Sequence, residues 1–181
     1  MESTQDLLFD NAPVDIRSLP STEQLTFNRL ADGYLWVMFL RSNLFFLIIS
    51  LIAVIITLAK GELELTDWLY AAGGWFVLWV LFNVLIPLKF RQKGYALRDK
   101  DMVYKSGLLW KKIIIIPLNR IQHCEVQQGP FSKIFGLKSL TAFTAGGASS
   151  DLRVAGLPEE KAEQLKEFII SKITNEHDTT S

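Results

Sequence analysis

The sequence is poor in the residues from which most catalytic and metal sites are built. Its 181 residues include one cysteine and two histidines, and the formal net charge is zero. The single cysteine, Cys124, excludes a disulfide within the chain and fits a reducing compartment. The balanced charge gives no electrostatic reason for a nucleic-acid partner. We therefore expect no nucleic-acid partner, no cofactor and no metal.

The start of the sequence also lacks the features of a signal peptide. Met1–Asp6 is acidic and polar, without the basic region and the early apolar core that such a peptide needs. We therefore expect any membrane-spanning segments to be internal anchors. Residues 1–24 contain Pro13, Pro20 and several acids but few large apolar residues, which favours an extended or disordered arm.

Charge is absent from one long stretch of the sequence. Trp68–Leu88 contains no charged residue, and Leu44–Ala59 is interrupted only by two hydroxyl residues. A membrane-spanning helix needs about 20 mostly apolar residues, and a helix satisfies its own backbone groups in lipid. Residues 43–88 are therefore predicted to form a two-helix transmembrane hairpin, with the polar segment 60–67 connecting the helices.

Two features inside the hairpin predict contacts between its helices. Ser50 and Asn83 lie at similar predicted depths, which indicates a hydrogen bond between them. Ala71–Gly74 offers a flat patch that would allow close approach of the other helix.

The charges around the hairpin predict its orientation. Net charge is −3 over residues 1–43, −2 over 44–88 and +5 over 89–181. Because Lys and Arg accumulate on the cytoplasmic side of membrane spans, we expect both termini in the cytoplasm and the connecting loop outside. The basic residues that follow the second helix are Lys89, Arg91, Lys93, Arg98 and Lys100.

Two interpretations are open for residues 25–42. Their apolar residues recur at spacings of three and four, which is typical of an amphipathic helix lying along the inner leaflet. Alternatively, Tyr34–Leu40 extends the first span inward. Gly33 and Arg41 favour a break in the helix, so we expect a separate interfacial helix.

Short segments rich in β-formers follow the hairpin. Turn residues separate them, and this pattern is typical of an antiparallel sandwich or a small barrel. The six expected strands are residues 95–98, 102–106, 113–116, 121–126, 140–144 and 152–154.

The last segment has the spacing of an amphipathic helix. Pro158 and the two glutamates after it are typical of a helix N-terminus. The apolar residues that follow at helical spacing form one stripe. They are Ala162, Leu165, Phe168, Ile169 and Ile173. Residues 175–181 are expected to form a polar tail.

Several motifs follow one another in a recognisable order after the hairpin: Tyr95 to Leu97, Val103–Gly107, Ile116–Ile121, Val126–Gln128, Phe135–Leu137 and Thr144–Gly147. In this order, and behind two transmembrane helices, they resemble the bacterial pleckstrin-homology-like family of small membrane proteins, the second type of bacterial PH domain. The resemblance covers roughly residues 30–174.

The resemblance implies a fold and a setting for the chain. The expected fold is a membrane α-helical hairpin followed by a mainly-β PH-like partly open barrel, residues 89–174, capped by the C-terminal α-helix. Such a barrel has seven strands, and we expect the seventh within residues 107–117 or 136–139. The resemblance also implies the bacterial cytoplasmic membrane, no catalytic residues, and a partner that is a larger membrane protein with PH-like modules.

A basic and aromatic segment is the first candidate interaction site. Lys105, Lys111 and Lys112 flank Leu108, Leu109 and Trp110 in the connection between two expected strands. Lysines near an anionic leaflet contribute about 1 kcal/mol each, and tryptophan sits readily at headgroup depth. This segment is a candidate membrane contact. The alternative is that Leu108 and Trp110 enter the barrel.

A run of four isoleucines is the second candidate. A barrel strand turns one face to the core, so two of Ile113, Ile114, Ile115 and Ile116 should point outward. Outward isoleucines indicate burial by another chain or by the membrane surface. The alternative is that the C-terminal helix or Phe131–Leu137 covers them.

The two remaining features favour structural roles. His123 and Cys124 are adjacent on a strand and point to opposite faces, so we expect a packed cysteine and a half-exposed histidine. Gly146 and Gly147 precede another strand, which indicates a hairpin turn and not a phosphate-binding loop.

The sequence predicts a membrane-anchored, cytoplasm-facing binding module that acts as a subunit or scaffold of a membrane protein complex, by self-association or with another membrane protein. The alternative is an adaptor that senses the lipid surface through Leu108–Trp110. A membrane-bound enzyme is disfavoured.

Overall fold

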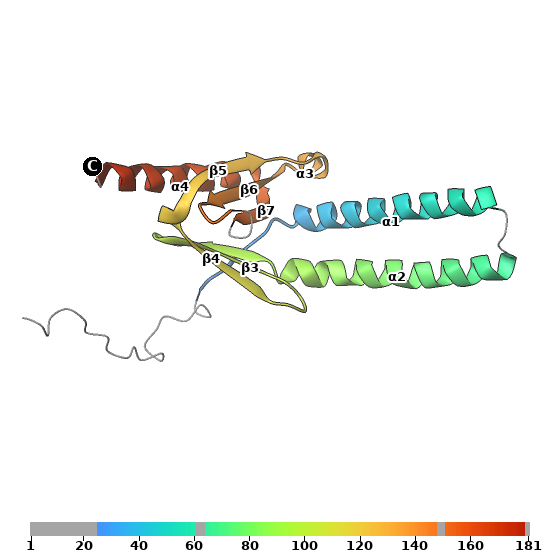
Figure 1. Ribbon diagram of the computed structural model, residues 1–181. Helices are drawn as coiled ribbons and strands as arrows, with labels where there is room; N and C mark the ends of the chain where they lie inside the picture. Colours follow the sequence, from blue (N-terminus) through green and yellow to red (C-terminus); the bar gives the residue numbers. More distant parts are fainter. Residues whose placement is uncertain (1–24, 61–63, 148–150, 180–181) are drawn as a thin grey trace, which may run out of the picture.

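The computed structural model describes residues 25–60, 64–147 and 151–179. Two long helices lie side by side and extend away from a domain of seven short strands and a C-terminal helix (Figure 1). This agrees with the fold class expected from the sequence: an apolar hairpin, then antiparallel sheets that form no closed barrel within the described residues, then a helix. The expected arm, residues 1–24, lies outside the described residues.

The hairpin consists of helix α1 (Gly33–Lys60) and helix α2 (Leu65–Arg91). Each contains a 27-residue stretch that is long and apolar enough to cross a membrane. Most of the apolar side chains on both helices are exposed. Surfaces of this kind are stable in lipid and unstable in water, which agrees with the predicted hairpin.

Tryptophan side chains supply hydrogen bonds between the two helices. Trp75 Nε1 donates to Ser50 Oγ at 2.8 Å. Trp79 Nε1 donates to Asn43 Oδ1 at 2.8 Å, and Asn43 Nδ2 donates to Asn83 Oδ1 at 3.1 Å. The predicted bond between Ser50 and Asn83 is therefore wrong. Their depths were measured from a helix end at Asn43, whereas α1 begins ten residues earlier.

The small residues of α2 do not face α1. A Cβ added at Gly73 or Gly74 would meet no atom within 4 Å. Large aromatic rings make the helix contact instead: the ring centroid of Phe46 lies 5.1 Å from that of Trp75 and 5.4 Å from that of Phe82. The prediction of close helix approach at Ala71–Gly74 is wrong because these rings hold the helices apart.

Residues 25–42 do not form a separate interfacial helix. Strand β1 (Asn28–Arg29) pairs antiparallel with strand β2, with Asn28 opposite Tyr95 and Arg29 opposite Gly94. Helix α1 then begins at Gly33 and passes Arg41 without a break. The alternative, in which Tyr34–Leu40 extends the first span, is the correct one. Pairing with β2 favours the extended form of β1, and exposed Arg41 needs no break in the helix.

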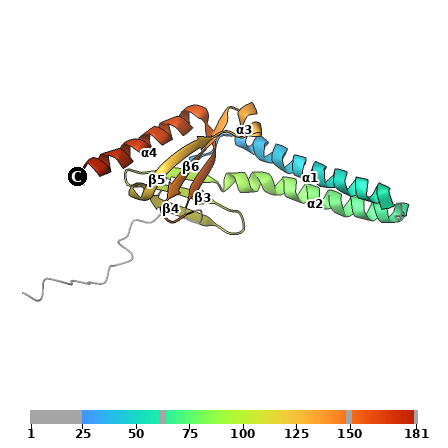
Figure 2. The ribbon, with the colours of Figure 1, turned by 45° about the horizontal axis from the view of Figure 1, so that its top comes forward.

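The strands form two antiparallel sheets (Figures 1 and 2). The first sheet has the order β1, β2 (Gly94–Leu97), β3 (Asp101–Ser106) and β4 (Lys112–Pro117). A single turn, η3 (Leu118–Arg120), leads to the second sheet, with the order β5 (Ile121–Gln127), β6 (Leu137–Thr144) and β7 (Leu152–Pro158). Between β5 and β6 lies the short helix α3 (Pro130–Ile134).

The seventh strand comes from a part of the chain that the sequence did not indicate. All six expected strands are present, but residues 107–111 form the turn between β3 and β4, and 137–139 belong to β6. The seventh strand is β1, which precedes the hairpin. Its location was predicted wrongly because two residues carry no detectable strand periodicity.

The segment after β1 joins the two sheets. Ala31 N–H donates to Gly156 O of β7 at 3.0 Å, and Leu30 beside it is only 4% exposed. Gly156 has a φ of +77°, and a Cβ there would lie 2.4 Å from the ring of Tyr34. Glycine is thus required where the first turn of α1 packs on β7. The sheets are joined on this side, while β4 and β5 are edge strands.

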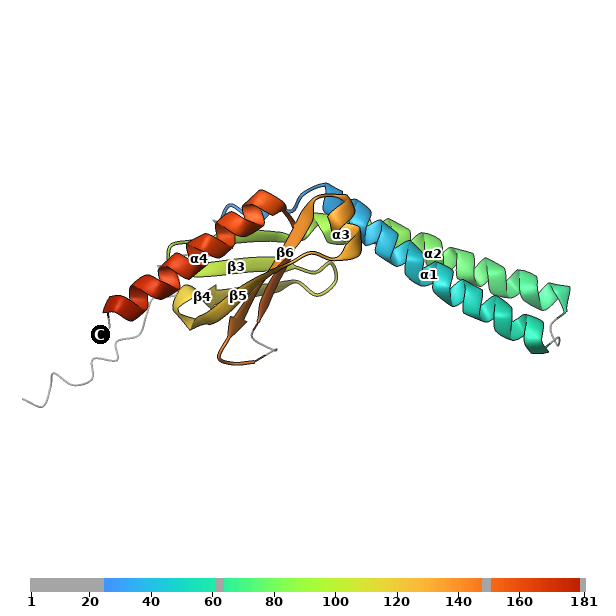
Figure 3. The same ribbon diagram turned by 90° about the horizontal axis from the view of Figure 1, so that it is seen from above.

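Helix α4 (Glu159–Thr179) lies along the second sheet (Figure 3). The predicted stripe faces the core: Ala162 and Ile169 are fully buried, and Leu165, Phe168 and Ile173 are partly buried against it. Lys138 of β6 forms ion pairs with two glutamates in the first turns of α4. The helix runs to Thr179, so most of the predicted polar tail is helical.

Candidate functional site

The isoleucine strand β4 is an edge strand with two outward-facing side chains. Ile113 is 47% exposed and Ile115 is 46% exposed, whereas Ile114 and Ile116 face the core. Among the described residues, β4 pairs only with β3, so one row of its backbone groups is free. Neither α3 nor α4 covers the outward isoleucines.

A groove adjoins this edge of the sheet. Its volume is about 700 Å³, and it lies between β4, η3, the start of β5, the end of β6 and the C-terminal part of α4. Its apolar walls are formed by Ile114, Ile115, Ile116, Ile121 and Ile173. A free strand edge beside an apolar groove can receive a strand of another chain, with main-chain bonds on the edge and side chains in the groove.

The turn between β3 and β4 carries the predicted membrane-contact residues. Leu109 is 87% exposed and Trp110 is 86% exposed, so the alternative in which Trp110 enters the barrel is wrong. Leu108 is half-buried, and Lys111 and Lys112 are exposed.

The third flanking lysine, Lys105, and a glycine also belong to this part of the fold. Lys105 places its ammonium 5.6 Å from the ring centroid of Phe27, so it is engaged with the N-terminal segment. Gly107 has a φ of +104°, and a Cβ there would overlap the carbonyl of Trp110. The turn extends from the domain toward the same side as the hairpin (Figures 1 and 3).

Helix α3 lies at this same end of the domain, beside the start of α1 (Figure 2). Ile134 at its end is 71% exposed. Phe131–Leu137 was one of the two alternative covers predicted for the outward isoleucines of β4. The structure places α3 against α1 and β6 instead.

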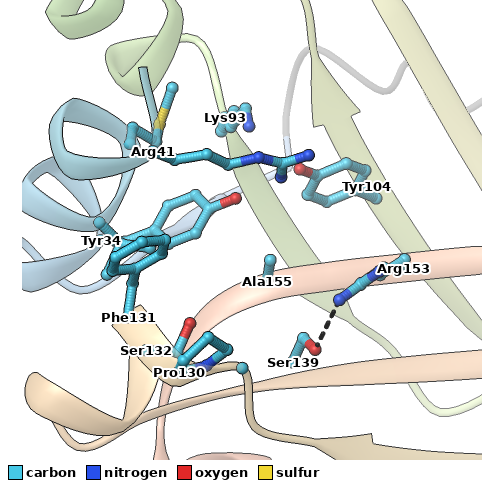
Figure 4. A pocket seen from close by; sticks show the side chains of 13 residues that line it. Tyr34, Arg41, Lys93, Tyr104, Pro130, Phe131, Ser132, Ser139, Arg153 and Ala155 are labelled. Atoms are coloured by element: carbon cyan, nitrogen blue, oxygen red, sulfur yellow. Dashed lines mark hydrogen bonds between the residues drawn. The ribbon is translucent and has the colours of Figure 1, made fainter. Parts of the chain in front are cut away.

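A basic pocket lies where the hairpin meets the domain (Figure 4). It is an open pocket of about 490 Å³ between α1, β3, α3, β6 and β7. Arg41 reaches into it toward Tyr104, and Arg153 lies across from them (Figure 4). Arg153 Nη2 donates to Ser139 Oγ at 3.3 Å, and Lys93 Nζ lies 5.3 Å from the ring centroid of Tyr34.

The pocket carries positive charge that no carboxylate of the described residues neutralises. Within the described residues, none of Arg41, Lys93 and Arg153 forms an ion pair with a carboxylate. Partial burial, with the nearby charges of Lys89 and Arg41, lowers the pKa of Lys93. Burial raises the pKa of Tyr104 to about 12.

This pocket was not predicted from the sequence. The signal was present: Arg41 interrupts the apolar residues before the first span, and Lys93 follows the second span. These two residues lie near the inner ends of the hairpin, but Arg41 was interpreted only as a helix break and Lys93 only as a sign of orientation. Arg153, from β7, could be joined to them only by the fold.

The adjacent His123 and Cys124 point to opposite faces, as expected. The ring of His123 is exposed and stacks on Phe143, with centroids 4.4 Å apart. Cys124 packs beneath α4, and burial raises the pKa of its thiol. No group of three potential metal ligands occurs among the described residues.

Comparison with protein families identifies the chain. The family described as "Bacterial PH domain" matches residues 43–173, which is more than two thirds of the sequence. The chain belongs to the bacterial PH domain family. The two helices and the strand-rich domain with its C-terminal helix are therefore those of a bacterial PH domain membrane protein.

Two relatives of this bacterial PH domain protein come from Bacillus subtilis (strain 168). UPF0699 transmembrane protein YdbS is 27% identical over 139 residues, covering 72% of this chain and 86% of the relative. UPF0699 transmembrane protein YdbT is 31% identical over 103 residues, covering 55% of this chain but 21% of the relative. No solved structure matches the chain.

The family match and the fold differ at one end. The bacterial PH domain match begins at Asn43, inside α1, whereas the folded unit begins with β1 at Asn28. In this protein the bacterial PH domain is completed by residues that lie before the hairpin and outside the match.

Proposed function

We propose that this bacterial PH domain protein is a subunit of a membrane protein complex in the bacterial cytoplasmic membrane. The hairpin anchors the chain, both termini lie in the cytoplasm, and the PH domain binds a strand of a partner protein. The partner is another membrane protein with PH-like modules, or a second copy of this chain.

The free edge of β4 supports this proposal. An unpaired strand edge is normally protected by charge, by a bulge or by a covering element. Here the outward residues Ile113 and Ile115 are exposed, and the lysines stand only at the start of the strand. The apolar groove beside the edge offers pockets for alternate side chains of an added strand.

The lengths of the relatives agree with a partner of the same family. YdbS is of similar length to this chain, whereas the part of YdbT that resembles the chain is about one fifth of that protein. A short and a long protein with similar modules in one organism could pair through equivalent strand edges.

Two substitutions on β4 test the proposal. Ile113→Lys leaves the core untouched, so the domain should stay folded while the complex dissociates. Ile114→Lys buries an unpaired charge, which costs several kcal/mol against a typical stability of about 5–15 kcal/mol, so the domain should unfold. Complex size after extraction in mild detergent and protease resistance of residues 94–174 measure the two outcomes.

An exposed isoleucine elsewhere provides the control. Ile170 on α4 is 45% exposed, so Ile170→Lys should affect neither complex size nor folding. If Ile113→Lys and Ile170→Lys both keep the native assembly size, β4 is not an interface and the proposal is wrong.

A second candidate function, sensing of the lipid surface, rests on the turn between β3 and β4. Leu109 and Trp110 are highly exposed beside Lys111 and Lys112, and the turn extends toward the side of the hairpin. In this case the emission of Trp110, measured as wild type minus Trp110→Phe, should be quenched by lipids brominated near the headgroup. Absence of quenching would remove this candidate.

A further inference from the structure

The basic pocket lies at the depth where lipid headgroups are found. Helix α1 has 28 residues, or about 42 Å at 1.5 Å per residue, whereas the hydrocarbon core is about 30 Å thick. With Lys60 at the outer boundary of the core, about eight residues extend beyond the core at the inner end of α1. Arg41 lies eight residues after Gly33, at the boundary between hydrocarbon and headgroups, on the end of the hairpin that joins the domain (Figure 1).

The pocket has the donors that a phosphate group requires. Arg41, Lys93 and Arg153 come from three different elements and line one space, and none is neutralised by a carboxylate of the described residues. Asp32 lines a neighbouring space together with Lys93 but forms no ion pair with it. The hydroxyls of Tyr34 and Tyr104 face the pocket without a hydrogen bond to another described residue (Figure 4).

An apolar groove continues the pocket along the hairpin. It measures about 330 Å³ and shares Tyr34, Met38, Arg41 and Lys93 with the basic pocket. Beyond these shared residues it is lined by aromatic and aliphatic side chains of both helices, one serine and one lysine. They are Phe45, Phe46, Phe82, Ile86, Ser42 and Lys89.

The two spaces together match an amphiphile. On α1, residues 34, 38, 41 and 45 follow one face of the helix, so a single stripe leads from the cationic end to the apolar end. A free phosphate ester would use only the cationic part. No carboxylate is present among the described lining residues to receive the ammonium of a zwitterionic headgroup.

We propose that this junction binds one anionic phospholipid. Arg41, Lys93 and Arg153 hold the phosphate by charge-assisted hydrogen bonds, with the Tyr104 hydroxyl as a further donor. One acyl chain lies in the groove past Phe46 and Phe82. The lipid bridges α1 and β7, so it fixes the PH domain relative to the hairpin. This proposal does not depend on the partner proposed for β4.

The first experiment uses the unmodified full chain in detergent and native mass spectrometry. Phosphatidylglycerol and phosphatidylethanolamine with the same acyl chains are compared, and glycerol 3-phosphate is added as a soluble competitor. We expect one phosphatidylglycerol retained at least about tenfold better than phosphatidylethanolamine, because the latter lacks net charge. Excess glycerol 3-phosphate should not displace it.

Either of two results overturns the proposal. Equal retention of both lipids would mean that the cations do not select the headgroup. Displacement by glycerol 3-phosphate at the concentration of the lipid would mean that the groove contributes nothing and that the ligand is a soluble phosphate ester.

The second experiment separates a site from the lipid that surrounds any membrane helix. The double variant Arg41→Gln/Arg153→Gln should lose the preference for phosphatidylglycerol by about ten- to hundredfold. Arg41→Lys should keep part of the preference for phosphatidylglycerol. Lys161 is an exposed residue of α4, so the control Lys161→Gln should keep the full preference. A double variant that is protease-resistant yet retains the full preference would refute the site.

Discussion

Because β1 lies before the hairpin, we predict that Leu30, outside the family match at residues 43–173, stabilises the PH domain. Leu30 is 4% exposed and belongs to the same core as Met102, Val154 and Ile169. Truncation of a buried leucine to alanine removes apolar contacts and leaves a cavity, which costs about 2–5 kcal/mol. For a domain of this size, each kcal/mol shifts the melting temperature by about 4–8 °C. Leu30→Ala should therefore lower the melting temperature by roughly 8–40 °C.

The assay is thermal unfolding of the full chain in detergent, followed by proteolysis of residues 94–174 at each temperature. The matched control is Leu109→Ala, because Leu109 is 87% exposed and its truncation should cost less than about 0.5 kcal/mol. Equal melting temperatures for both variants would refute the reasoning, since Leu30 would then lie outside the core and β1 would not belong to the domain.

Two further predictions test the junction and the orientation. Gly156→Ala should destabilise the domain by about 1–3 kcal/mol or more, because the new Cβ combines a positive φ with a 2.4 Å approach to Tyr34. In the control Gly129→Ala the new Cβ meets no atom within 4 Å, so this variant should be neutral. Equal thermal stability of the two variants would contradict this prediction. A reporter fused after Ser181 should lie in the cytoplasm and one inserted at Glu64 should lie outside, because Lys and Arg residues follow the second span. An external reporter after Ser181 would reverse the proposed orientation.

The hairpin, the strands after it and the C-terminal helix could be predicted because each carries a strong local pattern. The charge-free run of α2 is long enough to identify a span alone, and the stripe containing Ile169 identifies the face that α4 buries. The outward pair on β4 follows from the alternation of a strand, although alternation cannot say which two isoleucines face out.

The errors concern features that depend on residues far apart in the sequence. Strand β1 is stabilised by β2 and by Gly156, and neither lies near it in the sequence, so residues 25–42 resembled an amphipathic helix. The basic pocket combines Arg41, Lys93 and Arg153 from both sides of the hairpin. Helix periodicity and turn residues carry no information about such distant pairs.

The insertion of the hairpin between β1 and β2 affects how the protein is made. Strand β1 is synthesised before the helices, and its partner β2 is synthesised after them. Pairing of Asn28 with Tyr95 therefore requires that both ends of the hairpin return to the same side of the membrane. A chain with only one helix inserted would leave β1 and β2 on opposite sides and the core around Leu30 open to proteases. Closure of the sheet therefore depends on both helices of the hairpin lying in the same membrane.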